Sequence, residues 1–188
     1  RAPTQSNSHH HLRRIRAYRM GATLPCRAHM ETPPRNLNFT FREYTPADLP
    51  ACLEVFTSNI PEFFSEEERE EFIAFVQRSP GGYGVVVNAD GQIVGCGGIA
   101  RSRTNPHGAD LTWGMIHHAL HRQGIGRILT RERLSLIDAM PDVTVVYLNT
   151  SHLTEAFYEK FGFRTVKLIP NGYRVGLHRC DMERIRSA

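Results

Sequence analysis

The sequence predicts an α/β (α+β mixed sheet) fold in which helices flank a central sheet. Alternating or β-branched stretches indicate seven strands, and stretches with apolar residues three and four apart indicate four helices. Short turns between strands indicate antiparallel hairpins, whereas one strand–helix–strand segment indicates a crossover. The expected order is therefore β-α-α-β-β-β-α-β-α-β-β, without internal repeats.

The elements of the first half begin with an alternating strand at residues 39–44. Thr45-Pro46-Ala47-Asp48 then predicts a helix start, with Thr as N-cap, Pro at the first helical position and a carboxylate at the third. Ser65-Glu66-Glu67-Glu68 is a capping box that indicates a second helix. Strands at residues 83–88 and 92–99 form a hairpin around Asp90-Gly91, a pair suited to a tight turn.

The second half contains the predicted crossover. The expected elements are a strand at 109–117, a helix at 124–140, a buried strand at 143–149, a helix at 151–161 closed by Gly162, and a last hairpin of 163–168 and 173–181 over Pro170-Asn171-Gly172.

The chain divides into a leader, residues 1–38, and a single domain, residues 39–185. The leader mixes Arg, His, Ser, Thr and Pro without apolar periodicity, so we expect it to be disordered. Residues 1–29 hold six arginines and no Lys, Asp or Glu, so removing them changes the net charge from +4 to −2. The domain therefore gives no electrostatic reason to expect nucleic acid. A nucleic-acid-binding leader and an organelle transit peptide are the alternatives for this Arg-rich segment.

Composition excludes several other classes of protein. The sequence has no run of eighteen apolar residues and no secretory signal pattern, so we expect no membrane association and a cytoplasmic location. Its four cysteines are far apart and form no C-x-x-C pair, which predicts free thiols and no metal site. The triplet His9-His10-His11 is more typical of a solvated tail than of a metal site.

A glycine-containing segment connects a predicted strand to a predicted helix. We call His121-Arg122-Gln123-Gly124-Ile125-Gly126 the glycine loop. It is not a P-loop, and Leu129 stands where a dinucleotide fingerprint needs its third glycine. Glycines let a backbone approach a ligand closely, and the first N–H groups of a helix lack internal partners. The loop thus predicts an anion site, with a tight turn that serves only packing as the alternative.

The glycine loop resembles the Q/R-x-x-G-x-G/A signature of the GNAT superfamily of N-acetyltransferases. Two longer stretches, WGMIHHALHRQGIGRIL and SHLTEAFYEKFGF, are similar to that family's fourth strand, coenzyme loop and third helix, and to its fourth helix and sixth strand. The resemblance extends over roughly residues 39–182 in element order. It departs from the family at His121, where Arg or Gln is usual, and at Ser151, where Asn is common.

The resemblance implies a GNAT-like acyl-CoA N-acyltransferase fold that uses acetyl-CoA as co-substrate and no metal. It implies that loop amides hold the pyrophosphate of the coenzyme and that a backbone N–H of Met115 or Ile116 contacts the thioester oxygen. The coenzyme-binding residues it implies are Met115, Ile116, His117, His121, Arg122, Gln123, Gly124, Ile125, Gly126, Arg127 and Ser151.

Acetyl transfer to an amine needs a base for the amine proton and benefits from an acid for the departing thiolate. By resemblance Tyr158 is the general acid, and a phenol does hold its proton at neutral pH; helix packing is its alternative role. Asp110 corresponds to a catalytic carboxylate on the fourth strand of some members. His117, His118 or a water chain are alternative bases.

The expected acceptor is a small-molecule or peptide primary amine, which attacks the thioester directly in a ternary complex. By resemblance its pocket lies among the first two helices, their loop and the last hairpin. There Ile60, Phe63 and Phe64 either line the pocket or pack in the core. We expect a monomer or homodimer. The alternative function is a coenzyme A-binding sensor without turnover, which would not need Tyr158.

Overall fold

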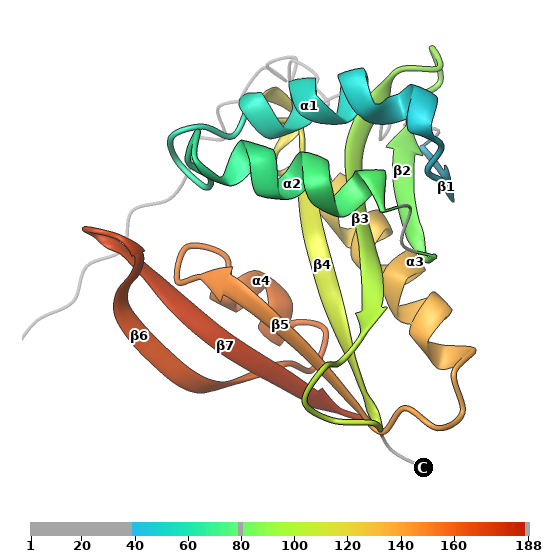
Figure 1. Cartoon of the computed structure of the whole chain (residues 1–188). Coiled ribbons are helices and arrows are strands. Elements are labelled where there is room, and N and C mark those ends of the chain that lie inside the picture. Colours follow the sequence, from blue (N-terminus) through green and yellow to red (C-terminus); the bar gives the residue numbers. More distant parts are fainter. Residues whose placement is uncertain (1–38, 79–80, 187–188) are drawn as a thin grey trace, which may run out of the picture. The chain divides into compact units, whose positions relative to one another are not determined.

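A seven-stranded mixed sheet lies at the centre of the computed structural model, which describes residues 39–78 and 81–186 (Figure 1). The strand order is β1-β2-β3-β4-β5-β7-β6, and every neighbouring pair is antiparallel except β4 and β5. The strands are β1 (Thr40–Glu43), β2 (Tyr83–Val87), β3 (Ile93–Arg101), β4 (Gly108–Ile116), β5 (Val145–Ser151), β6 (Arg164–Arg174) and β7 (Leu177–Ile185). The predictions for residues 1–38 lie outside the described residues.

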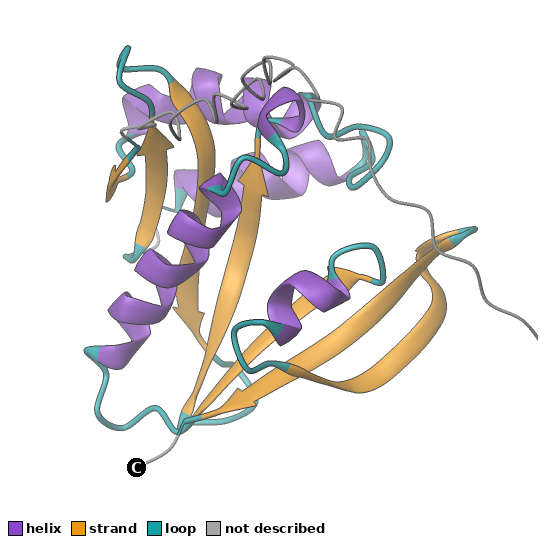
Figure 2. Cartoon of the chain, turned by 180° about the vertical axis from the view of Figure 1, so that it is seen from behind, coloured by secondary structure: helices purple, strands orange, loops and turns teal. Residues whose placement is uncertain are grey.

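Helices cover both faces of the sheet (Figure 2). They are α1 (Leu49–Thr57), α2 (Glu68–Gln77), α3 (Ile125–Asp138) and α4 (Glu155–Glu159), with short 3₁₀ turns η1 (Pro46–Asp48) and η2 (His118–Leu120). The predicted fold class and element order are confirmed.

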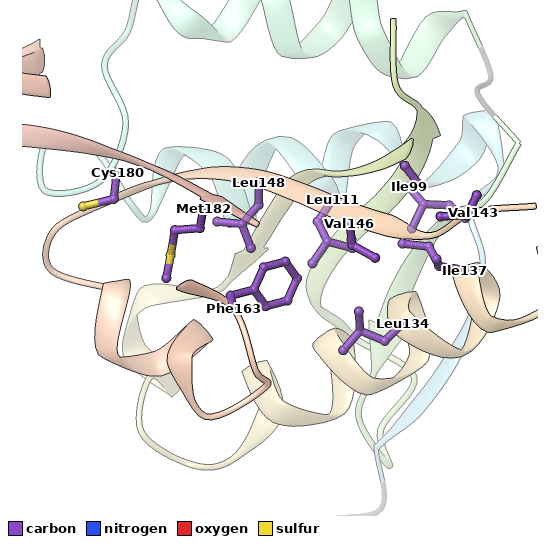
Figure 3. Packing of buried hydrophobic residues seen from close by; sticks show 11 residues of the cluster. Ile99, Leu111, Leu134, Ile137, Val143, Val146, Leu148, Phe163, Cys180 and Met182 are labelled. Atoms are coloured by element: carbon purple, nitrogen blue, oxygen red, sulfur yellow. The ribbon is translucent and has the colours of Figure 1, made fainter. Parts of the chain in front are cut away.

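Three buried clusters show which helix packs on which strands. Side chains of α1 and α2, including Phe56 and Phe72, pack with Tyr83, Val85 and Met115 on one face. On the opposite face, α3 contributes to two clusters, one with the ends of β2 to β4 and one with β4, β5 and β7. The latter cluster contains Leu134 of α3 and Phe163, which follows α4 (Figure 3). The sheet therefore separates an α1–α2 side from an α3–α4 side.

The helix start that the sequence predicts at Thr45 is the beginning of η1, which leads directly into α1 at Leu49. Thr45 and Asp48 form the capping box, and Asp48 also accepts two hydrogen bonds from the guanidinium of Arg42 at 2.7 and 2.8 Å. The Arg42 hydrogen bonds hold the pKa of the Asp48 carboxyl at about 2, despite the opposing effect of its burial. The ion pair ties β1 to the beginning of α1.

Two predicted boundaries are wrong. Ser151 ends β5 and does not begin a helix, because the Thr154 hydroxyl and N–H both bond to the Ser151 carbonyl and α4 starts only at Glu155. The last hairpin turns at residues 175–176 and not at 170–172. Asn171 adopts φ 56° and holds the hairpin end together, since its side chain accepts from the Gly176 N–H. The sequence Pro-Asn-Gly therefore makes an irregularity within β6.

Candidate active site

The two parallel strands at the centre of the sheet separate along their length (Figure 1). β4 pairs with β5 only at Gly108, Ala109 and Asp110, whereas β3 continues to pair with β4 as far as Ile116. We call the unpaired segments, residues 111–116 of β4 and 148–151 of β5, the fork. Among residues 39–78 and 81–186, no strand pairs with the backbone groups on the inner edges of the fork, which can therefore bond to a ligand.

A β-bulge interrupts β4 within the fork. The register shifts so that Trp113 and Gly114 lie opposite Gly97, and Trp113 has φ 41°. The hydroxyl of buried Tyr83 donates to the Trp113 carbonyl at 3.2 Å, and the Trp113 ring packs against Phe72 at 5.4 Å between ring centroids. These contacts hold the strained backbone in place, and bulges of this kind commonly lie beside functional sites.

The end of β4 presents one backbone amide to the fork. The N–H of His117 donates to the Val94 carbonyl of the β3 side at 2.8 Å. Because backbone groups alternate along a strand, the Ile116 N–H points the other way, toward β5. The Ile116 carbonyl accepts from buried Asn59 and from the His121 ring, both at 2.9 Å. The ring of His121, a predicted coenzyme-binding residue, is therefore hydrogen-bonded to the end of β4.

The glycine loop leads from the fork into α3. Gly124 has φ 87° and Arg122 has φ 64°, so the chain turns sharply before the helix. Within the described residues, the backbone N–H groups of 122–126 donate to no carbonyl, and the first that does belongs to Arg127. Five successive amides at a helix start form an arrangement that binds anions.

Helix α4 lies beside the beginning of α3. A Cβ added to Gly126 would lie 3.5 Å from the ring of Phe157, which is ordinary contact. Tyr158, the next residue, is half-buried and packs edge-on against Phe163 at 6.0 Å between ring centroids. The structure thus brings the helix that carries Tyr158 next to the glycine loop, and Ser151 ends the neighbouring strand, where it is buried.

Asp110 lies away from the glycine loop and α4, at the end of the fork where β4 and β5 still pair. It pairs with Ala100 and Tyr147, and Ile116, the last residue of β4, lies about 20 Å further along the strand, given the ordinary rise per residue. Burial raises the pKa of the Asp110 carboxyl, and the charge of Arg103 opposes this rise. Its neighbours Ala109 and Leu111 face α3, so Asp110 faces the α1–α2 side.

The loop between α1 and α2 is joined to both sides of the fork. The His118 ring contacts the Glu62 carboxylate at 2.9 Å, and Ser58 accepts from the His118 N–H at 3.0 Å. From the other side, Arg174 of the β6–β7 hairpin donates to the carbonyls of Pro61 and Glu62 at 2.5 and 3.1 Å. These contacts make the α1–α2 loop a bridge from the β4–α3 connection to the hairpin.

The three predicted pocket residues have different environments. Ile60 and Phe64 pack against the α1–α2 core, and Phe64 stacks on Trp113 at 6.1 Å. Phe63 instead lies against His121, with 5.4 Å between ring centroids. His117 lies apart from these three residues and lines an open cavity of about 650 Å³ together with Leu53 and Thr57 of α1.

Sequence reasoning missed several residues that organise the site. Three of them join segments that are far apart in the chain: Asn59, Glu62 and Arg174. The fourth is Arg133, a residue of α3 whose side chain is buried. The only sequence signal for them is a polar or charged residue within an otherwise apolar stretch, such as Asn59 before Ile60.

In the described parts of the chain, no three His, Cys, Asp or Glu side chains are grouped so that they could hold a metal ion. The helices of the same parts are too short or too polar to span a membrane.

Comparison with known proteins identifies the family. Residues 42–185 match the profile of the acetyltransferase (GNAT) domain. The chain belongs to the GNAT acetyltransferase family. It is thus an acetyl-transferring enzyme, and family members use acetyl-CoA as co-substrate and act on amine acceptors.

Solved structures of N-acetyltransferases share the GNAT fold with this chain. A GCN5-related N-acetyltransferase from Kribbella flavida is 21% identical with a TM-score of 0.64, and the alignment covers 79% of this chain and 98% of that one. A ribosomal-protein-alanine N-acetyltransferase from Brucella melitensis is 22% identical with a TM-score of 0.61, covering 78% and 99%. An N-acetyltransferase from Staphylococcus aureus is 17% identical with a TM-score of 0.64, covering 79% and 98%. No curated protein sequence is significantly similar to the chain.

Proposed function

We propose that this GNAT enzyme transfers the acetyl group of acetyl-CoA to a primary amine by direct attack while both substrates are bound. The observation that carries the proposal is the run of amides at residues 122–126, which donate to no carbonyl in the described part of the chain and lie at the start of α3, next to the fork. Backbone N–H groups and the positive end of the helix dipole suit a pyrophosphate. Arg122 and Arg127 are exposed there and add positive charge.

The fork supports a second part of the proposal. An extended pantetheine arm can bond to the inner edges of two strands that no longer pair, as a further strand would. When bound, acetyl-CoA supplies an activated thioester. Of the two predicted oxyanion donors, we choose Ile116 over Met115, because alternation along β4 directs the Ile116 N–H toward β5 and the Met115 N–H toward β3.

The proton transfers are assigned to two side chains. We propose that the Tyr158 hydroxyl donates its proton to the departing thiolate, since α4 lies beside the end of the glycine loop, at Gly126. We propose that Asp110, about 20 Å along β4 from Ile116, accepts the amine proton through a chain of water molecules. The raised pKa of its half-buried carboxyl and its position on the α1–α2 side of the fork support this role. The amine then forms its bond to the acetyl carbon as the carbon–sulfur bond breaks.

The proposed acceptor site is the space beside the fork on the α1–α2 side. The α1–α2 loop and the β6–β7 hairpin border it, and Arg174 joins the two. Phe63 supplies an apolar wall, whereas Ile60 and Phe64 support the loop from the core. Because binding residues commonly lie on loops, we propose that this site binds a small-molecule or peptide amine.

Thermal unfolding with and without acetyl-CoA tests the proposal. A ligand that binds only the native state stabilises it by about 2.7 kcal/mol at 100 times its dissociation constant. We expect a clear rise in melting temperature with acetyl-CoA, followed by acetylation of at least one member of a panel of amines and peptides. An unchanged melting temperature at millimolar acetyl-CoA would contradict the assignment of the glycine loop.

A further inference from the structure

Arg133 is a buried arginine in the middle of α3. Its side chain is among the largest fully buried ones, with 1% exposure, and its Nε donates to the Gly98 carbonyl at 3.0 Å. Its Nη1 is buried without a hydrogen-bond partner, and within the described residues no carboxylate forms an ion pair with it. A buried positive charge without a counter-charge is costly, so its presence calls for a function.

The sheet makes room for this guanidinium with glycine. A Cβ on Gly114 would lie 2.2 Å from Arg133 Nη1, and a Cβ on Gly97 would lie 3.4 Å from its Cδ. Any side chain at Gly114 would therefore displace the charged group. These two glycines face each other at the β4 bulge, so Arg133 lies directly against the bulge from the α3 side.

The bulge is thus held from both faces of the sheet. Tyr83 binds the Trp113 carbonyl, and Arg133 packs on Gly114. The two groups also influence each other across the strands: burial raises the pKa of the Tyr83 hydroxyl, and the positive charge of Arg133 opposes that rise. Arg133 and Tyr83 therefore contact neighbouring residues of the bulge from opposite faces of the sheet.

The position of the bulge gives this charge a role. Ile116, the proposed oxyanion donor, follows Gly114 by two residues on the same strand. Displacing the bulge would move that N–H, and a positive charge in an environment that excludes water stabilises negative charge nearby.

We propose that Arg133 is a positioning residue for acetyl transfer, which fixes the β4 bulge from the α3 side and polarises the thioester carbonyl bound at the fork. This inference rests on the proposed function. It assigns a purpose to the buried charge, to the glycines opposite it and to the bulge together.

The test measures the thioester carbonyl directly and needs no acceptor. Infrared spectra of acetyl-CoA labelled with ¹³C at the carbonyl are recorded free and bound to the full-length protein. The variants are Arg133→Met, which removes the charge at similar volume, and Arg133→Lys, which restores it. Arg184→Met is the matched control, because Arg184 also has a buried Nη1 that bonds to no described residue but lies on β7, beside Gly162.

We expect the parent protein to lower the carbonyl stretching frequency of the bound thioester. Arg133→Met should lose about half or more of that shift, since preorganised charge is the main source of such polarisation. Arg133→Lys should recover part of the shift, and Arg184→Met should match the parent. Because the Met variant removes a costly buried charge, its melting temperature should be equal or higher.

Two results would overturn the inference. A parent-like frequency in Arg133→Met shows that Arg133 does not polarise the carbonyl, and a parent-like frequency in Arg133→Gln decides the same point if the Met variant fails to fold. A large fall in melting temperature for both Met and Lys variants, with the frequency unchanged, assigns Arg133 a purely structural role. Failure of the parent to bind acetyl-CoA is a different result, because it refutes the proposed function itself.

Discussion

The ring of Phe157 on α4 lies 3.5 Å from the point that a Cβ on Gly126 of α3 would occupy. This contact joins the beginnings of the two helices that flank the fork on the α3–α4 side. It leaves space for a methyl group at position 126 but not for a longer side chain directed toward Phe157.

Substituting the glycine loop should separate folding from coenzyme binding. Gly126→Ala should fold normally, because its Cβ meets only ordinary van der Waals contacts. Gly126→Glu should abolish measurable acetyl-CoA binding, since bulk and negative charge are added where a pyrophosphate is proposed. Gly124→Ala should lower the free energy of unfolding by about 1 kcal/mol, because Gly124 has φ 87°. Calorimetric titration measures the affinity for acetyl-CoA, and thermal unfolding measures the stability of each variant.

Gly81→Glu is the control for the added carboxylate. Gly81 is exposed, and a Cβ there would meet no atom within 4 Å. This variant should bind acetyl-CoA as the parent does. Parent-like affinity in both Gly126→Glu and Gly124→Glu would show that the loop does not hold the coenzyme.

Removing the hydroxyl of Tyr158 should slow catalysis and leave binding intact. The ring packs against Phe163 and the α3–α4 core, and a phenylalanine ring in its place would keep those contacts. We expect Tyr158→Phe to lower kcat by about 10²-fold, because the general acid is lost. The dissociation constant of acetyl-CoA should stay within about twofold of the parent value. Steady-state kinetics with an identified amine provide the measurement.

Tyr44→Phe is the matched control, since Tyr44 packs edge-on against Tyr83 in the α1–α2 core. It removes the same hydroxyl from a tyrosine outside the proposed site. Equal rates for the parent and Tyr158→Phe would assign Tyr158 to helix packing.

The order of elements was predictable because local signals dominate it. Asp90-Gly91 specifies a hairpin, and Thr45 with Asp48 specifies a helix start, through contacts within a few residues. The predicted boundary at Ser151 was wrong because Thr154, three residues later, bonds to the Ser151 carbonyl and delays the helix. Pro170-Asn171-Gly172 was misassigned because Asn171 bonds to Gly176 and moves the turn along the chain.

The position of the candidate site in the fold was predictable only where a contiguous motif carries its residues. The glycine loop and the helix of Tyr158 are short segments, and the structure brings them together. Arg133 and Asn59 act through groups more than thirty residues away, at Gly98 and Ile116 respectively. No periodicity encodes such pairs, because they depend on how strands are ordered in the sheet.

The assignment of Asp110 as base predicts a pH dependence. A general base must be deprotonated, so kcat/KM should rise with pH through the pKa of the Asp110 carboxyl, which burial raises above its usual value. Asp110→Asn should remove that acidic limb and lower kcat/KM by about 10²-fold. The measurement is a pH–rate profile with a fixed acceptor.

Asp90→Asn, in the exposed β2–β3 turn, should leave the profile as in the parent. An acidic limb that persists in Asp110→Asn would assign the base to another group, such as His118 or a water chain.

The ion pair between Asp48 and Arg42 predicts that stability depends on acid pH. The pKa of Asp48 is about 2 in the folded protein, below its ordinary value of 3.8. A lowered folded pKa stabilises the native state above the unfolded pKa, and this contribution is lost as the pH falls from about 4 to about 2. Asp48→Asn should therefore lower the free energy of unfolding by about 1–2 kcal/mol at pH 7, a value reduced because Arg42 is half exposed. Urea unfolding at several pH values should show that the difference in stability between Asp48→Asn and the parent vanishes near pH 2.

Asp142→Asn is the control. It breaks the exposed pair with Arg101 and should change the free energy of unfolding much less. A deficit of Asp48→Asn that stays constant down to pH 2 would mean that the capping geometry, and not the charge of Asp48, is what stabilises the start of α1.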